Sequence, residues 1–316
     1  MGRVSEPVVR PRLSRRVRYV AACVVLLALV GYFAVQYDSN SGGAPRCTVV
    51  AADGGGPDAP SYSFTPEQAA NAATIAVVGT AKRMPERAVT IALATALQES
   101  ALRNIRHGDR DSLGLFQQRP SQGWGKPEQI MDPTYAAGIF YDRLAEVPGY
   151  SRLPLTVAAQ RVQRSGFPQA YAKHEPDARL LSAALTGRSP GSLSCSGPRG
   201  VTAGDPAKVR TELVRAFGKE AVAATGGSAG ESARAAGWEI TVVPGASAER
   251  GGHTFEERGW AVAHWAVARA SVLHVERVSF GGRVWQAGKN QGRWKTGAPA
   301  GPPAGDRVRI TVAAGD

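Results

Sequence analysis

The chain has 316 residues, enough for one or two compact domains with connecting segments. With 43% hydrophobic and 20% charged residues, its composition excludes a fully disordered protein. The 38 basic residues outnumber the 26 acidic ones and give a net charge of +12. Such a balance favours polyanionic surroundings, which include nucleic acid, anionic lipid and a bacterial wall.

The N-terminal part predicts a membrane anchor. Residues 19–37 are uncharged and largely apolar, and nineteen residues as a helix span roughly 28 Å, the thickness of a bilayer core. The preceding segment 1–18 holds six arginines and one glutamate, so the positive-inside rule places it in the cytoplasm. We therefore expect a single-pass membrane protein with the bulk of the chain outside the cell.

A cleaved secretory signal is the alternative to an anchor. The sequence after the apolar run, Ala34-Val35-Gln36, is a poor cleavage site, so we favour the anchor. Both alternatives export the rest of the chain. The exported part has no zinc finger, aromatic RNA-binding motif or basic helix, which disfavours a nucleic-acid partner and leaves the anionic cell envelope.

The cysteines agree with export. Cys23 lies inside the predicted span, which leaves Cys47 and Cys195 as the two thiols outside the membrane. An exported protein can be oxidised, and we predict that these two residues form a disulfide.

The exported part divides by its pattern into four segments. Glycine and proline in 38–64 predict a flexible stalk, and 65–187 predicts an all-helical domain with one long loop between 103 and 131. Segment 188–236 is expected to be a linker with one short helix, and 237–316 a small α+β module. The expected helices are about 69–81, 85–102, 133–144, 156–164, 168–185, 205–217 and 256–274, and the expected strands are 238–243, 275–280, 283–287 and 307–312.

A glutamate at the end of the second helix is the first candidate for chemistry. Glu99 follows Ala92 and Ala96 at spacings that place all three on one helix face. Small residues let neighbouring chain approach, which would desolvate the carboxyl group and raise its pKa. A carboxylic acid that stays protonated near neutral pH can donate a proton to a leaving group. A solvated glutamate near a helix end is the alternative.

Three short motifs lie around this glutamate. They are Glu99-Ser100, then Gly-Leu-Phe-Gln at 114–117, then Val-Gln-Arg-Ser at 162–165, followed later by Tyr171. They resemble the motifs of soluble lytic transglycosylases and goose-type lysozymes, which are Glu-Ser, Gly-Leu-Met-Gln and Ala-Tyr-Asn-x-Gly. Phenylalanine replaces methionine in the second motif, and Val-Gln-Arg-Ser stands where Ala-Tyr-Asn is expected in the third. The resemblance covers about 65–187 and implies a lysozyme-like fold. The departure in the third motif leaves open a protein that binds glycan without cutting it.

The resemblance also implies a reaction and a set of site residues. In lytic transglycosylases a single glutamate protonates the oxygen between N-acetylmuramic acid and N-acetylglucosamine, then takes the proton of the muramoyl C6 hydroxyl as a 1,6-anhydro ring closes. By this likeness Glu99 is the catalytic residue. The expected substrate-binding residues are Ser100, Gly114, Gln117, Gln118, Gln163, Ser165 and Tyr171.

Other members of the loop are open to two interpretations. Gly114 would let the backbone approach the sugar, and Trp124 would stack on a sugar face or anchor the loop. If the chain instead hydrolyses the bond, a second carboxylate is required, and Asp109 and Asp111 are the nearby candidates. Their alternative role is to hold the loop through turn hydrogen bonds.

We expect no metal and no cofactor. His253, His264 and His274 lie in the C-terminal module without a recognisable ligand motif. The tryptophans of this module are expected in its core, while Trp285 and Trp294 could also bind glycan.

The sequence thus favours a membrane-anchored enzyme that cleaves peptidoglycan glycan strands, with a catalytically inactive peptidoglycan-binding or envelope-partner protein of the same fold as the alternative. It does not predict the oligomeric state.

Overall fold

The computed structural model describes residues 45–51, 59–165, 169–196, 202–219, 238–244, 254–289, 292–297 and 307–314. Residues 45–316 belong to one compact unit. Within the described ranges, no helix combines the length and the hydropathy needed to cross a membrane. The predicted cytoplasmic segment 1–18 and the predicted membrane helix 19–37 lie outside these ranges.

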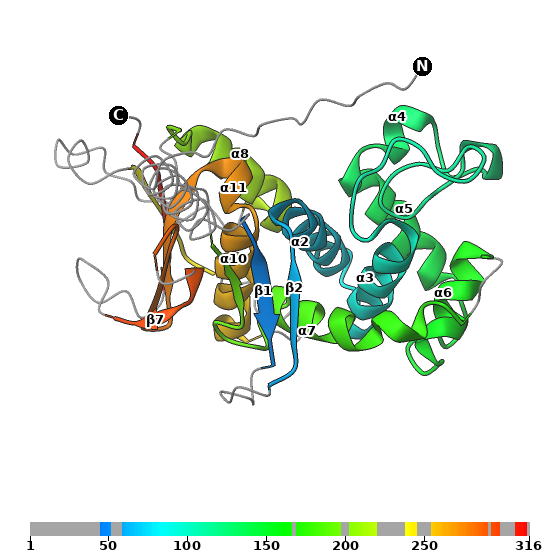
Figure 1. Cartoon of the computed structure of the whole chain (residues 1–316), viewed down its shortest axis with the longest axis horizontal. Coiled ribbons are helices and arrows are strands. Elements are labelled where there is room, and N and C mark those ends of the chain that lie inside the picture. The colour runs from blue at the N-terminus through cyan, green and yellow to red at the C-terminus, as the bar shows by residue number, and fades with distance from the viewer. Residues whose placement is uncertain are drawn as a thin grey trace, which may run out of the picture. The chain divides into compact units, whose positions relative to one another are not determined.

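Helices form more of the described structure than strands do, and several helix starts follow the expected signals (Figure 1). Thr65 caps the first one in a capping box with Gln68, and Asp132 caps another through the backbone NH of Thr134. The helices of this part are α2 (Pro66–Ala81), α3 (Glu86–Ser100), α4 (Pro127–Ile130), α5 (Pro133–Ala145), α6 (Leu155–Gln163) and α7 (Glu175–Leu185), with short 3₁₀ turns at Pro120–Gln122 and Ala172–His174.

Helix α3 is the centre of the helical part. Every residue from Ala88 to Leu97 is buried, and α2, α5, α6 and α7 pack around the helix. The helix ends because Ala101 and Leu102 both adopt positive φ, 52° and 58°. Their carbonyl oxygens accept hydrogen bonds from Gln68 and Asn71 of α2, each at 2.8 Å. These bonds fix the last turn of α3, which carries Glu99.

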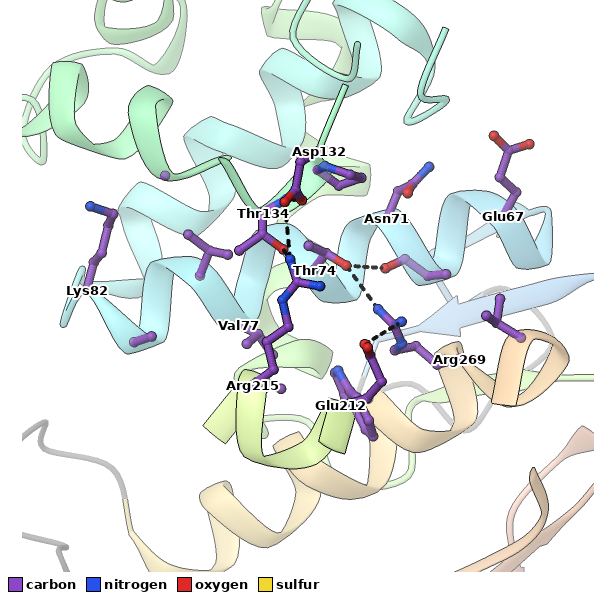
Figure 2. Close-up of a pocket in the computed structure, with 18 of the residues that line it drawn as sticks. Glu67, Asn71, Thr74, Val77, Lys82, Asp132, Thr134, Glu212, Arg215 and Arg269 are labelled. Carbon is purple, nitrogen blue, oxygen red and sulfur yellow. Dashed lines mark hydrogen bonds and ion pairs between the residues drawn. The ribbon is translucent and has the colours of Figure 1, made fainter. Parts of the chain in front are cut away.

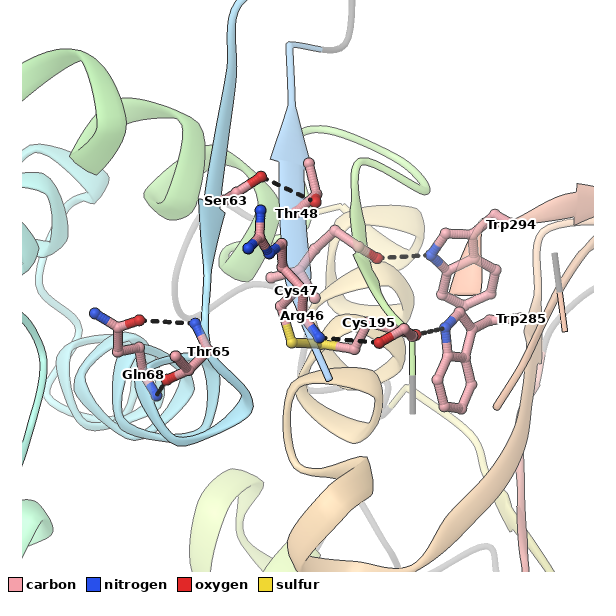
Figure 3. The surroundings of a disulfide bond; sticks show 11 residues. Arg46, Cys47, Thr48, Ser63, Thr65, Gln68, Cys195, Trp285 and Trp294 are labelled. Atoms are coloured by element: carbon pink, nitrogen blue, oxygen red, sulfur yellow. Dashed lines mark hydrogen bonds between the residues drawn. A yellow bond between two sulfur atoms is a disulfide. The ribbon is translucent and has the colours of Figure 1, made fainter. Parts of the chain in front are cut away.

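Two strands lie in the segment 38–64 that we expected as a flexible stalk. Strand β1 (Cys47–Val50) pairs with β2 (Ser61–Phe64) on one side and with β3 (Leu193–Cys195) on the other, all antiparallel. Cys47 and Cys195 lie opposite each other across β1 and β3, and their disulfide confirms the predicted pairing (Figure 3). The expected stalk is therefore wrong for these residues: β1 and β2 pair with each other, and β1 is also fixed by β3, which lies far along the chain.

A second antiparallel sheet lies in the C-terminal part, with strand order β4-β8-β5-β6-β7. Gly281 and Gly282 join β5 to β6 with positive φ at both positions, as expected of a tight hairpin turn. The elements of this part are α8 (Pro206–Phe217), β4 (Trp238–Val242), α10 (Phe255–Ala268), α11 (Ala270–Leu273), β5 (Val275–Phe280), β6 (Arg283–Gln286), β7 (Lys295–Thr296) and β8 (Val308–Val312).

Helix α10 connects the C-terminal sheet with the helices. It packs against β5 and β8 on one side and against α2, α7 and β3 on the other. His264 of α10 is fully buried and donates its Nδ1 hydrogen to the carbonyl oxygen of Ala184 at the end of α7, at 2.7 Å. Two tryptophans continue this contact, since Trp285 donates to the carbonyl of Cys195 at 3.0 Å and Trp294 to that of Leu193 at 2.8 Å (Figure 3). The described C-terminal elements therefore share a core with the helical part.

A glycine at this junction offers a test of the packing. Gly187 has φ +85°, and a Cβ atom there would overlap the carbonyl of Glu257 in α10. We expect Gly187→Ala to lower the free energy of unfolding by about 2–4 kcal/mol, because strain and overlap with backbone add. Gly149→Ala is the matched control, since Gly149 has φ +66° and open space around it. Equal losses for the two variants in urea titrations would contradict the packing of α7 on α10.

Candidate active site

Glu99 lies on the last turn of α3 beside a buried tyrosine. The hydroxyl of Tyr171 donates to Oε1 of Glu99 at 2.6 Å, and Tyr171 has no exposed surface. Burial raises the pKa of the Glu99 carboxyl group, and hydrogen bonds from Tyr171 and Gln163 lower it by less, so the net shift is upward. The same burial, with the nearby charge of Glu99, raises the pKa of the Tyr171 hydroxyl. Tyr171 is therefore a donor to Glu99 across the ordinary pH range.

Gln163 and Ser165, from the third motif, join this site. The Gln163 side-chain amide is hydrogen-bonded to Glu99 and also donates from Nε2 to the carbonyl of Phe116 at 2.7 Å. The Ser165 side chain forms a hydrogen bond with Tyr171. Gln160 supports this turn, because its Nε2 donates to the carbonyl of Ser165 at 2.7 Å. The end of α6 is thus tied both to Glu99 and to the loop that contains Phe116.

Ser100 has a connecting role. Its hydroxyl is buried and lies 2.7 Å from the carbonyl oxygen of Leu115 and 3.1 Å from that of Ala96. The first contact attaches the loop at 114–118 to the helix turn that carries Glu99. Ser100 therefore positions the loop and does not face an open substrate site.

Three predicted binding residues of the loop also have structural partners. Gly114 has φ +73°, and a Cβ there would lie 2.8 Å from the carbonyl of Ile130, so the glycine makes room for α4. Gln118 is 1% exposed and donates to the carbonyl of Ala136 at 2.9 Å. Gln117 is half-buried and donates to the carbonyl of Gly114 at 3.1 Å. These bonds fold the loop, and burial removes Gln118 from contact with any external ligand.

The two candidate second carboxylates differ from Glu99 in their surroundings. Asp111 accepts from Arg119 Nε at 2.7 Å and from the backbone NH of Ser121 at 2.8 Å. The Arg119 guanidinium and the Ser121 groups hold the pKa of Asp111 well below its usual range. The Asp109 side chain is 93% exposed. Asp111 therefore braces the loop as an ion-paired carboxylate, and Asp109 is open to solvent, whereas burial raises the pKa of Glu99.

Trp124 anchors the loop. It is 6% exposed, and the guanidinium of Arg143 stacks over its ring at 3.5 Å from the centroid. Arg143 also donates to the carbonyl of Gly123 at 2.7 Å. One face of the indole is thus already covered, and the loop-anchor alternative for Trp124 agrees with the contacts.

A further pair near Glu99 was not found from the sequence. Nε2 of His174 lies 3.1 Å from Oε1 of Gln98, the residue before Glu99. Burial, and to a lesser degree the charge of Lys173, lowers the pKa of His174. The sequence signal that could have indicated His174 is its spacing from Tyr171, because three residues make about one turn of a 3₁₀ helix.

A groove of about 690 Å³ lies away from Glu99, along α2 and between α5, α8 and α10 (Figure 2). Four of its six charged lining residues form two ion pairs within it. Arg215 donates to Asp132 at 3.2 Å, and Arg269 donates to Glu212 at 2.9 Å and to Thr74 at 3.3 Å. The groove is therefore a seam between helices, crossed by ion pairs.

Among the residues that the structure describes, no group of three or more histidine, cysteine, aspartate or glutamate side chains could hold a metal ion. His264 is buried against Ala184, and His253 lies outside the described residues. Burial lowers the pKa of His264 to about 4, so it is neutral in the folded protein near pH 7. Trp285 is fully buried and donates to backbone, which assigns it to the core and not to a glycan surface.

Comparison with known proteins adds no assignment: no protein-family model matches the chain, and no curated protein matches it significantly.

Proposed function

We propose that this protein cleaves the glycan strands of peptidoglycan between N-acetylmuramic acid and N-acetylglucosamine, with Glu99 as the only acid and base. The observation that carries the proposal is the setting of Glu99. It is half-buried, its pKa is raised by burial, and it is held by Tyr171 at 2.6 Å. The packing of α2, α5, α6 and α7 around the buried helix α3 agrees with the lysozyme-like fold that we propose for residues 65–187.

The proposed reaction needs one group that first gives and then takes a proton. Protonated Glu99 gives its proton to the glycosidic oxygen as the bond to the muramoyl C1 breaks. The resulting carboxylate then takes the proton of the muramoyl C6 hydroxyl, whose oxygen bonds to C1 and closes the 1,6-anhydro ring. Glu99 recovers its proton and no water is consumed. Burial favours the acid form before the first step, and the donors Tyr171 and Gln163 stabilise the carboxylate after it.

The setting of the aspartates supports a single-carboxylate reaction. Hydrolysis by two carboxylates needs a second group that flanks the bond and acts as a base or nucleophile. Asp111 is occupied by Arg119 and Ser121, and Asp109 is exposed on the loop. Because the substrate's own hydroxyl closes the ring, the reaction needs neither Asp109 nor Asp111 as a second carboxylate.

We also propose that residues 38–316 act outside the cell, attached by the helix at 19–37. The Cys47–Cys195 disulfide supports this placement, because disulfides persist in oxidising compartments and are rare in the cytosol. The net positive charge of the exported part agrees with an anionic wall as its surroundings.

Tyr171→Phe tests the link between the tyrosine and Glu99. Loss of the hydroxyl removes a donor that lowers the Glu99 pKa, so this pKa rises further. Glu99 then stays protonated to higher pH, and the alkaline limb of the pH profile of kcat/KM should move to higher pH. We expect kcat/KM at the optimum to fall about tenfold, because the carboxylate formed in the reaction loses a hydrogen bond.

The control for this prediction is Tyr135→Phe, which removes a hydroxyl that donates to the carbonyl of Trp124 at 3.3 Å. Its pH profile should match that of the wild-type protein. An unchanged profile for Tyr171→Phe would mean that Glu99 is not the titrating acid.

A further inference from the structure

A cluster of positive charge adjoins the Glu99 site. The sequence from 160 to 174 contains no aspartate or glutamate but has three cationic residues, Arg161, Arg164 and Lys173. All three side chains are exposed. The same stretch supplies Gln163, Ser165 and Tyr171 to the site, so the donors around Glu99 and these cations come from one part of the chain.

Arg164 is the cation nearest to the site along the chain. It stands between Gln163, which is hydrogen-bonded to Glu99, and Ser165, which is hydrogen-bonded to Tyr171. It ends α6 with φ 52°, a conformation that costs energy for a residue other than glycine. No acidic side chain of the described residues forms an ion pair with it. Among the described residues, the guanidinium of this exposed arginine is therefore not engaged by an acidic side chain.

A second guanidinium lies within electrostatic reach of the first. Arg143 is held in place by the Trp124 ring at 3.5 Å and by the carbonyl of Gly123 at 2.7 Å. Burial lowers the pKa of Arg143, and the charge of Arg164 lowers it further, while Glu146 acts in the opposite direction. Two like charges near each other favour the approach of an anion.

We propose that Arg164, with Arg143 beside it, binds an anionic group of the glycan substrate next to the bond at Glu99. This inference rests on the proposed function for the identity of the substrate. A guanidinium matches the geometry of carboxylate and phosphate with paired hydrogen bonds, and both chemistries occur in walls: carboxylates on the peptides of peptidoglycan and phosphodiesters in attached polymers. Arg164 would then select strands by their charge, a role separate from proton transfer by Glu99.

The test measures binding without cleavage. Full-length Glu99→Gln protein and the double variant Glu99→Gln/Arg164→Gln are sedimented with insoluble peptidoglycan over a range of protein and salt concentrations. We expect the second change to weaken binding about three- to tenfold at low salt, since one charge-assisted contact is lost. The dependence of binding on salt should also become less steep.

Arg83→Gln in the same Glu99→Gln background is the matched control. Arg83 is also an exposed arginine after a helix, with φ 58° and no ion pair to a described acidic residue. Arg83→Gln changes the net charge by the same amount as Arg164→Gln, and the two arginines have similar backbone conformations. If Arg83→Gln and Arg164→Gln weaken binding equally, the effect is one of total charge and the proposal is wrong.

Two treated substrates identify the anion. Amidation of the peptide carboxylates should abolish the difference in binding between Glu99→Gln and Glu99→Gln/Arg164→Gln if the anion is a carboxylate. Removal of the phosphodiester polymers should abolish this difference if the anion is a phosphate. Either result supports the proposal, and a difference that survives both treatments overturns it.

The outcomes separate this inference from the proposed function. Wild-type protein that releases no fragments, together with weaker binding by Arg164→Gln, would overturn the cleavage proposal and leave the anion site in place. Normal cleavage by the wild type with unchanged binding by Arg164→Gln would support the cleavage proposal and overturn the anion site.

Discussion

Replacing Glu99 by glutamine is expected to lower the rate of glycan cleavage about 10²- to 10⁴-fold, the usual contribution of a general acid and base. Glutamine keeps the size of the side chain and can still accept a hydrogen bond from Tyr171, but it cannot exchange a proton. Release of soluble fragments from labelled peptidoglycan measures the effect. Binding to insoluble peptidoglycan should remain close to that of the wild type.

The matched control is Glu128→Gln, in an exposed position on the short helix α4. Its rate should equal that of the wild type. A Glu99→Gln variant that still cleaves at the wild-type rate would contradict the assignment of Glu99 as acid and base.

The same variant has a predicted effect on stability. Since the Glu99 pKa is raised in the folded state, folding is favoured when the group is protonated, and this contribution is lost as the pH rises from the unfolded pKa through the folded one. The free energy of unfolding of Glu99→Gln should therefore match that of the wild type near pH 4 and exceed it near pH 7. Urea titrations at the two pH values measure this difference.

Loss of the disulfide is the second large expected effect. The double variant Cys47→Ser/Cys195→Ser should lose about 2–5 kcal/mol of unfolding free energy. The bond joins residues 148 positions apart, so its removal frees a long loop in the unfolded chain. It also joins β1 to β3, the strand whose carbonyls accept hydrogen bonds from Trp285 and Trp294.

Guanidinium titration followed by tryptophan fluorescence measures this loss. Reductant should destabilise the wild-type protein and leave the double variant unchanged, which provides the internal control. Equal unfolding midpoints for the oxidised wild type and the double variant would contradict a structural role for the bond.

Local signals predicted most helices, but the helix expected at 168–185 begins only at Glu175, and the one expected at 256–274 is divided at Arg269 into α10 and α11. Thr65 with Gln68, and Asp132 with the following proline, mark helix starts through hydrogen bonds that involve neighbouring residues only. The strands β1 and β2 were missed because each has only four residues, and because β1, the middle strand of the sheet, also pairs with β3, which is distant in sequence. The packing of α7 on α10 brings Gly187 close to the carbonyl of Glu257 and His264 to that of Ala184, contacts between distant residues that no local pattern reveals.

The candidate site was predictable in part. Glu99, Gln163, Ser165 and Tyr171 were singled out by motif, and the structure brings them together. Gln118 was also expected from the resemblance, but its amide is used inside the fold. Whether a polar side chain in a loop faces solvent or backbone depends on the tertiary path of the loop, which motif spacing does not contain.

The most direct test of the account is the mass of the fragments that full-length protein releases from purified peptidoglycan, measured beside the Glu99→Gln variant. We predict muropeptides lighter by one water than the reducing products, because the 1,6-anhydro ring replaces hydrolysis, and none from the variant. Reducing-end products would contradict the single-carboxylate reaction. Absence of any fragment from folded wild-type protein would contradict the cleavage itself.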